Sequence, residues 1–450
     1  MTTPQTGRGA DGDALKAAVF AEIDRRADEI VAFSDTVMRA PESGYREETT
    51  ARRVAERFAA MGLEFRERLA LTGVKARMRG RTSRRTVAVI GELDSLIVPG
   101  HPYADPATGA AHACGHNAQL ASMLGAGLGL APVMDRLDGD VVLFAVPAEE
   151  CIEVGWRLDR RDAGDVEFIL GKAELIRLGE FDDVDLAMMT HSGNAVADPA
   201  VTVACSANGS LVKRVVFRGR SAHAGATPEL GVNALKAALL AVAAIDAQRD
   251  TFKDADAVRV SQIITAGGDA VSAVPAEARM EMMVRARTVE AMADASGKVD
   301  RALRAGALAL GAEVEIETVS GYLPLATDAP LDELLYANCA RLYGPDLVRR
   351  DTGPIGGSTD MGDLGHLMPV GHPMAASGNA SPFHGPDYHV VDHVLAAVEP
   401  AKFMAATVID LLRDGAAEAD RVIAACGPKL KREAYLELRR GLEGRESFTS

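Results

Sequence analysis

The feature that most constrains the fold is a set of short apolar runs, each ending in an acidic residue or a histidine. Apolar runs of this length are typical of strands that are buried on both faces. Segments with helical periodicity separate them, and strands that alternate with helices predict an α/β domain with a mostly parallel sheet. The runs are TVAVIGELD (86–94), DVVLFAVPAEE (140–150) and DVDLAMMTH (183–191).

The pattern changes near residue 209. Residues 211–320 read as strand, helix, strand, strand, helix and strand, an order that fits a small ferredoxin-like α+β unit. We expect this unit to be inserted into the first domain, which then resumes. The predicted segments are 13–208 for the first part of the main domain, 209–322 for the insert and 323–450 for the second part.

Composition excludes several classes of protein. The 450 residues carry a formal net charge of −15, which disfavours nucleic acid and anionic membranes because both reward basic patches. The five cysteines are irregularly spaced, so we expect no disulfide framework and a reducing, cytoplasmic location. The N-terminal residues lack an apolar core and no uncharged apolar run reaches about 18 residues, so we expect neither signal peptide nor membrane span.

Ligand-type side chains recur where the predicted strands end, which is the edge where open α/β sheets bind ligands. Imidazole, thiolate and carboxylate together suit zinc and also accept manganese or cobalt. Each residue taken singly has an ordinary interpretation, such as a buried histidine or a solvated strand end, but together they favour a metal site. The residues are Glu92, Asp94, His112, Cys114, His116, Glu149, Glu150 and His191, with His384, His389 and His393 far downstream.

The adjacent carboxylates Glu149 and Glu150 suggest a division of labour. One can bind a cation while the other acts as a general base. A bound cation lowers the pKa of its water from ~15.7 to about 7, so hydroxide forms near neutral pH. A metal site with this pair of acids could therefore supply hydroxide near neutral pH.

Four collinear motifs add a resemblance to a known family. HACGHN (112–117), PAEE (147–150), GRSAHAGATPELGVNAL (219–235) and GGSTDMGDLGHLMP (356–369) resemble the aminoacylase and carboxypeptidase G family of metallohydrolases. Its amidohydrolase branch, with p-aminobenzoyl-glutamate hydrolase and the plant auxin-conjugate hydrolases, is the most similar. The resemblance implies a catalytic domain that holds two divalent metals and an inserted lid domain that mediates homodimerisation.

The same resemblance implies roles for single residues. Glu149 would be the general base that passes a proton from water to the leaving nitrogen. Asp94 would orient a ligand histidine, or it is only a helix or turn cap. Cys114 would bridge the two metals as a thiolate. The implied metal ligands are Cys114, His116, Glu150, His191 and His384.

The lid carries three further candidates. His223 resembles the family histidine that reaches the partner subunit's active site and donates to the developing oxyanion; otherwise it is a surface histidine. Arg285 resembles an arginine that clamps a substrate carboxylate, or it is a surface arginine. Ser272 stands where the family usually has asparagine, so its contact with substrate is expected to differ.

Trp156, which follows the paired acids, is either an aromatic platform for substrate or a core residue.

The leading hypothesis is a metal-dependent amidohydrolase that cleaves a C–N bond in a small carboxylate-bearing substrate. The substrate would be an N-acyl or aryl amino acid or a dipeptide, and the cofactor two divalent metals per subunit, zinc or manganese, with cobalt also acceptable. The alternative within this class is an aromatic aminohydrolase that releases ammonia from an aminobenzoate or anthranilate. A non-catalytic binding protein and a single-metal site are further alternatives.

Overall fold

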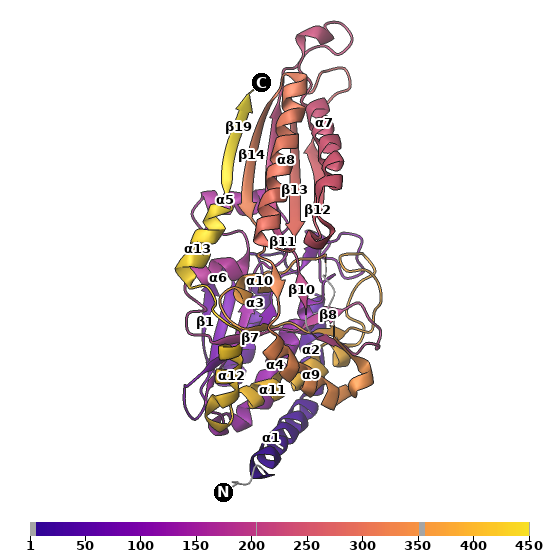
Figure 1. Ribbon diagram of the computed structural model, residues 1–450. Coiled ribbons are helices and arrows are strands. Elements are labelled where there is room, and N and C mark those ends of the chain that lie inside the picture. Colours follow the sequence, from indigo (N-terminus) through magenta and orange to yellow (C-terminus); the bar gives the residue numbers. More distant parts are fainter. Residues whose placement is uncertain (1–5, 204, 351–355, 450) are drawn as a thin grey trace. The chain divides into compact units, whose positions relative to one another are not determined.

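The computed structural model describes residues 6–203, 205–350 and 356–449 (Figure 1). Its contacts divide the chain into two compact units. The first unit holds the described residues up to 205 together with 326–350 and 363–432. The second unit holds 206–325, 356–362 and 433–449.

The main sheet of the first unit has the strand order β1-β2-β6-β3-β7-β17. β6, β3, β7 and β17 run parallel, and β2 and β1 add an antiparallel edge. Every residue of β3 and β6 is buried, as expected for strands covered on both faces. The predicted mostly parallel α/β fold is confirmed. The strands are β1 (Glu64–Leu69), β2 (Gly73–Met78), β3 (Thr86–Glu92), β6 (Asp140–Val146), β7 (Leu186–Met188) and β17 (Val370–Gly371).

A smaller sheet in the same unit has the order β16-β9-β18-β8. It matters for function because β8 begins at His191. A further antiparallel pair joins β4 and β5. These strands are β16 (Val348–Arg350), β9 (Val201–Val203), β18 (Met374–Ala376), β8 (His191–Gly193), β4 (Leu96–Ile97) and β5 (Ala110–Ala111).

Helix α4 is the central helix of the first unit. It packs against β3 and against α1, α2 and α11, and nearly all its residues are buried, so it has no polar face. No helix within the described residues is long and apolar enough to cross a membrane. The helices are α1 (Thr6–Arg25), α2 (Ala27–Met38), α3 (Glu48–Ala60), α4 (His116–Leu130), α5 (Val154–Asp162), α6 (Gly171–Arg177), α9 (Ala329–Tyr343), α11 (Glu399–Leu412) and α12 (Ala417–Ala425).

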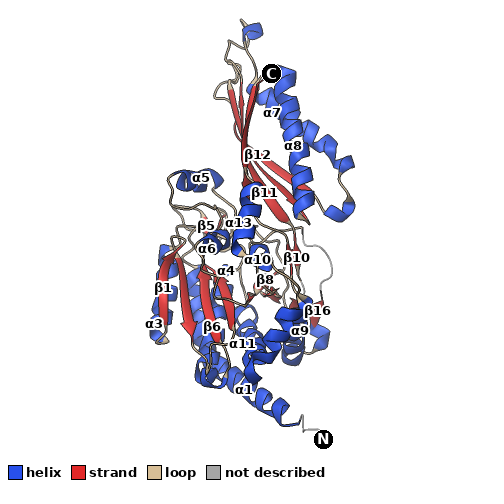
Figure 2. Ribbon diagram, turned by 60° about the vertical axis from the view of Figure 1, so that its left-hand side comes forward, coloured by secondary structure: helices blue, strands red, loops and turns tan. Residues whose placement is uncertain are grey.

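The second unit contains the predicted order of strand, helix, strand, strand, helix and strand. Its sheet has the order β12-β13-β11-β14-β19 with antiparallel neighbours, and α7 and α8 lie together on one face (Figure 2). The ferredoxin-like inserted unit is confirmed. Its elements are β11 (Gly209–Arg218), α7 (Ala234–Ala247), β12 (Arg259–Ala266), β13 (Glu277–Ala286), α8 (Val289–Leu310), β14 (Glu313–Ser320) and β19 (Gly444–Thr449).

Strand β19 departs from the sequence-based expectation that residues 323–450 all return to the main domain. It pairs with β14, from Glu313 opposite Thr449 to Thr318 opposite Gly444 (Figure 1). The chain end thus belongs to the second unit, because a free sheet edge offers it a ladder of backbone partners. Four short elements lie where the chain passes between the units: β10 (Ser206–Ala207), β15 (Leu325–Ala326), α10 (Met361–Gly365) and α13 (Arg432–Gly441).

Candidate metal centre

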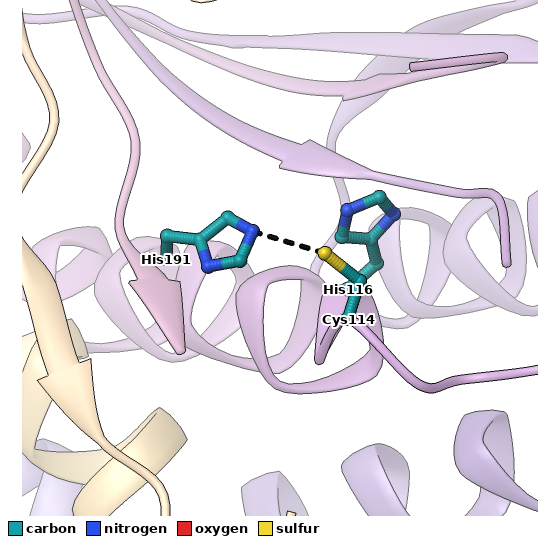
Figure 3. Close-up of side chains that lie close together, drawn as sticks. All are labelled: Cys114, His116 and His191. Carbon is teal, nitrogen blue, oxygen red and sulfur yellow. Dashed lines mark hydrogen bonds between the residues drawn. The ribbon is translucent and has the colours of Figure 1, made fainter. Parts of the chain in front are cut away.

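A glycine turn positions Cys114 and His116 at the start of α4. Gly115 between them has φ 93°, a left-handed conformation that side chains disfavour. A Cβ at this position would lie 2.6 Å from Cβ and Oγ of Ser192. The turn therefore requires glycine, and it projects both ligand-type side chains toward the same region (Figure 3).

His191 comes to this region from a different sheet. The sequence indicated a single strand ending at His191, but β7 ends at Met188 and His191 begins β8. Its Nδ1 lies 2.8 Å from the carbonyl oxygen of Ser192, which can only accept, so Nδ1 carries the proton. Nε2 is then an acceptor, and it lies 3.3 Å from Sγ of Cys114 (Figure 3).

Glu150 and His384 form the opposite side of the cluster. Nε2 of His384 lies 3.6 Å from Oε1 of Glu150. The backbone N–H of His384 donates to the carbonyl of Ala113 over 2.9 Å, so its loop is tied to the segment that carries Cys114. His384 has φ 64° and is exposed over 54% of its side chain. Positive φ in a non-glycine residue is strained and is common at functional sites.

The ligand-type atoms fall into three groups in which all members lie within 4.8 Å of one another. Cys114 belongs to two of them, and His116 also belongs to two. The structure therefore brings all five sequence-predicted ligands together, with Cys114 in the shared position. The groups are Cys114, His116 and His191; Cys114, Glu150 and His384; and Glu92, His116 and Glu149.

Asp94 lies behind His116. Nδ1 of His116 is 2.9 Å from the carbonyl oxygen and 3.3 Å from Oδ1 of Asp94, so this nitrogen faces acceptors and carries a proton. Oδ2 of Asp94 accepts the backbone N–H of Glu150 over 2.8 Å. One buried carboxylate thus contacts two of the candidate ligands and leaves Nε2 of His116 directed at the cluster.

The donor set fits divalent cations. Nε2 of His116, Oε2 of Glu92 and Oε1 of Glu150 are buried and have no hydrogen-bond partner within the part of the chain that the structure describes. Buried polar atoms are normally partnered, so atoms of this kind that converge point to a bound cation. Imidazole nitrogens, a thiol sulfur and carboxylate oxygens are ligands for zinc, manganese and cobalt.

The charges of the site also indicate that it requires a cation. Burial, followed by the Glu150 carboxylate, raises the pKa of Cys114 well above its ordinary value. A coordinated cation would reverse this effect by deprotonating the thiol. Burial and the nearby His372 lower the pKa of His191 to about 3, so this ring is neutral and its lone pair is available. His191 therefore presents a neutral imidazole, and the site needs positive charge to hold a thiolate.

Two further residues of the site are not among the ligands that the resemblance implies. Glu92 was noted as an acid at a strand end, and its Oε2 lies 3.1 Å from Nε2 of His116. Lys172, on α6, is fully buried with Nζ 2.6 Å from Oε1 of Glu92. Nothing in the local pattern distinguishes Lys172 from a surface lysine, because only the tertiary fold places it beside a carboxylate.

The predicted lid residues all lie in the second unit. Nδ1 of His223 accepts the backbone N–H groups of Gly225 and Ala226 over 3.2 and 3.0 Å. The loop of Ser272 is joined to that of His223, because the Ser272 carbonyl accepts the backbone N–H of Ala224 over 2.8 Å. Arg285 lies on β13 apart from this pair.

Trp156 is half-buried on α5. The guanidinium carbon of Arg46 lies 4.0 Å from the centre of its ring, and that of Arg160 lies 5.9 Å away. Trp156 is thus neither a bare platform nor a core residue. It is an aromatic surface against which arginines stack.

The chain is similar to several known proteins. Residues 206–309 match the peptidase dimerisation domain. Xaa-Arg dipeptidase from Mus musculus is 28% identical over 433 residues, which are 91% of each chain. Indole-3-acetyl-aspartic acid hydrolase from Enterobacter agglomerans is 29% identical over 303 residues, 63% of this chain and 64% of that protein. A dinuclear metal-binding peptidase of the M20 family from Bacillus subtilis has a TM-score of 0.64 at 19% identity, covering 86% of this chain and 98% of its own.

Taken with the site, these matches define the class: the chain is a metal-dependent hydrolase with a peptidase dimerisation domain. The resemblance to the aminoacylase and carboxypeptidase G metallohydrolases, in the branch of the amino-acid conjugate hydrolases, is confirmed.

Proposed function

We propose that this protein is an amidohydrolase that cleaves a C–N bond in a small carboxylate-bearing substrate, an N-acyl or aryl amino acid or a dipeptide. The observation that carries the proposal is the pair of three-residue groups that share Cys114, with Glu149 beside them. The names of the two relatives describe hydrolysis of a dipeptide and of an amino-acid conjugate, which supports this class of substrate.

Two divalent cations, zinc, manganese or cobalt, would be held by two sets of side chains with the Cys114 thiolate in common. When bound, such cations activate water and polarise a carbonyl group. The ligand sets are Cys114, His116 and His191 for one cation, and Cys114, Glu150 and His384 for the other.

Glu149 is proposed as the general base. Its side chain is largely buried, and its Oε2 lies 3.9 Å from Nε2 of His116. From this position a carboxylate can take a proton from the attacking water and deliver it to the departing nitrogen. Asp94 would keep His116 oriented by accepting from its Nδ1–H.

His223 is proposed to stabilise the oxyanion that forms during attack. Because its Nδ1 accepts two backbone N–H groups, the proton of the neutral ring lies on Nε2. This exposed N–H is a donor of the kind that an oxyanion requires. Ser272, whose loop is bonded to that of His223, is proposed to contact the substrate.

Arg285 is proposed to bind the substrate carboxylate. It lies directly opposite Arg259 of β12 in the strand register, and Nε of Arg285 is buried and without a hydrogen-bond partner among the described residues. Like charges opposite each other destabilise a sheet. A bound carboxylate would offset that repulsion and satisfy the guanidinium.

We also propose a homodimer formed through the second unit and a cytoplasmic location. Strand β12 lies at one edge of the sheet and exposes Ile263 and Ile264 over 61% and 40% of their surface, which is typical of an interface. Cys114 can serve as a ligand only when reduced, and the five cysteines are free thiols. Both features suit a reducing compartment.

The test is Glu149→Gln, which keeps the shape of the side chain and removes its basicity. We expect both metals to remain bound while turnover of N-acyl amino acids, dipeptides and aminobenzoyl-glutamate falls about 10²–10⁴-fold. Chelation of the wild type should abolish turnover, and added zinc, manganese or cobalt should restore it. Unchanged turnover in the variant would remove Glu149 from the mechanism.

The aromatic aminohydrolase alternative is not carried further, because the names of the two relatives describe hydrolysis of a dipeptide and of an amino-acid conjugate. Substituted anthranilates are included in the same substrate panel. Release of ammonia from them, without hydrolysis of any amino-acid conjugate, would reinstate that alternative.

A further inference from the structure

We infer that Glu92 is an additional ligand of the metal centre on the side of His116, with Lys172 holding its carboxylate in position. The inference rests on the proposed function, because it concerns the same cations. It also adds an oxygen ligand to a cation site that otherwise has only sulfur and nitrogen ligands.

The two oxygens of Glu92 have different surroundings. Glu92 ends β3 and is fully buried, as is Lys172. Oε1 lies 2.6 Å from Nζ of Lys172, whereas Oε2 is buried without a hydrogen-bond partner in the described part of the chain. A buried ion pair costs desolvation unless its remaining lone pairs are satisfied. A purely structural pair with Lys172 would leave Oε2 unsatisfied, so this oxygen points to a ligand.

The contact between Glu92 and His116 leads to the same conclusion. Its Nδ1 faces the carbonyl and carboxylate oxygens of Asp94 and carries a proton. If Nε2 binds a cation, it has no proton and presents a lone pair. Oε2 of Glu92 lies 3.1 Å from that nitrogen, and two lone pairs at this distance repel each other unless a cation contacts both.

The spacing is that of neighbouring ligands on one ion. Ligand atoms bound at ~2.1 Å and separated by ~90–110° lie about 3.0–3.4 Å apart, and the distance between Nε2 of His116 and Oε2 of Glu92 falls in this range. Glu92 would join Cys114, His116 and His191 on one cation. An added carboxylate raises the coordination number and favours the more oxygen-seeking manganese over zinc.

The experiment is titration of metal-free protein with Mn²⁺, Co²⁺ or Zn²⁺, using calorimetry and metal analysis after dialysis. Wild type should bind two ions per subunit. For Glu92→Gln we expect one ion per subunit at concentrations that saturate the wild type, with affinity at the weakened site lowered about 100-fold. Glu92→Asp is a second variant, to be used if Glu92→Gln does not fold. It keeps the charge near Lys172 but withdraws the oxygen by one methylene, so we expect the same loss of one ion.

Glu174→Gln is the matched control. Glu174 is also a buried carboxylate with an arginine partner, but it belongs to none of the three groups of ligand atoms, so its variant should bind two ions with wild-type affinity. Wild-type affinity at both sites in Glu92→Gln or Glu92→Asp would overturn the inference and leave the proposed function intact. A wild type that binds no divalent metal would instead overturn the proposed function.

Discussion

At the scale of single residues, the protonation of a buried carboxylate depends on whether a cation faces it. Burial raises the pKa of Glu92, but Lys172 makes the largest of the contributions that lower it, to about 2. Asp332, buried on α9, accepts a hydrogen bond from the Thr327 hydroxyl over 2.7 Å. Burial, with a smaller contribution from Asp328, raises the pKa of Asp332 to about 6.

Asp332 makes stability depend on pH. The folded-state pKa of about 6 exceeds the ordinary value of 3.8, so the folded protein binds this proton more tightly than the unfolded chain does. The favourable contribution of this proton to the free energy of unfolding is complete below pH 3.8. Up to about 3 kcal/mol of it is lost as the pH rises through 6. Asp332→Asn should therefore gain stability relative to wild type between pH 4 and 8. Thermal unfolding of both proteins across this range measures the difference in their stability. A stability difference that does not change with pH would contradict the prediction.

At the scale of elements, the site depends on how closely α4 can approach its neighbours. A Cβ at Gly125 would lie 2.9 Å from side-chain atoms of Ala401 and Ile30, and one at Gly91 would lie 2.9 Å from the Leu120 backbone. Small residues let the helix lie against β3 and α11, so that the ligand turn at its start meets β8. The many small residues of α4 permit this close packing.

Gly115→Ala should disrupt the metal centre rather than only the turn. The left-handed conformation costs a side chain roughly 1–2 kcal/mol, and contact with Ser192 at 2.6 Å adds overpacking of about 1–3 kcal/mol. We expect lower stability and weaker metal binding, because Ser192 adjoins His191. Gly164→Ala is the control, since Gly164 has φ 82° and no atom within 4 Å of the added Cβ. Equal metal affinity in the two variants would contradict the prediction.

At the scale of the whole molecule, the two edges of the second unit's sheet differ. The chain end, as β19, pairs with β14 and covers one edge, whereas β12 forms the other. Unpaired edge strands with exposed apolar residues associate with other strands. The dimer proposed above would therefore use β12.

Ile263→Lys should convert a dimer into a monomer, because the charge is placed on the free edge strand and would be desolvated on pairing. Light scattering after size-exclusion chromatography measures the mass. Metal content should be unchanged and turnover lost, since the resemblance implies that His223 acts in the active site of the partner subunit. Leu178→Lys, a like change at an exposed leucine of the first unit, should leave mass and turnover unchanged. A monomeric wild type, or a fully active monomeric variant, would contradict this arrangement.

The sequence alone predicted the α/β main domain, the ferredoxin-like insert and the family. These features depend on local information: apolar periodicity shows which faces are buried, and collinear motifs retain their order and spacing. The resemblance also implied the five ligand-type residues that the structure brings into proximity, and three of them, Cys114, His116 and Glu150, lie within the quoted motifs.

Tertiary structure alone decided three other features: the return of the chain end as β19, the start of a second sheet at His191, and the burial of Lys172 against Glu92. Strand pairing joins residues more than a hundred positions apart, so periodicity does not report it. Whether a lysine is a surface charge or the partner of a metal-site carboxylate depends on the solvent and charges around it, and those exist only once the chain has folded.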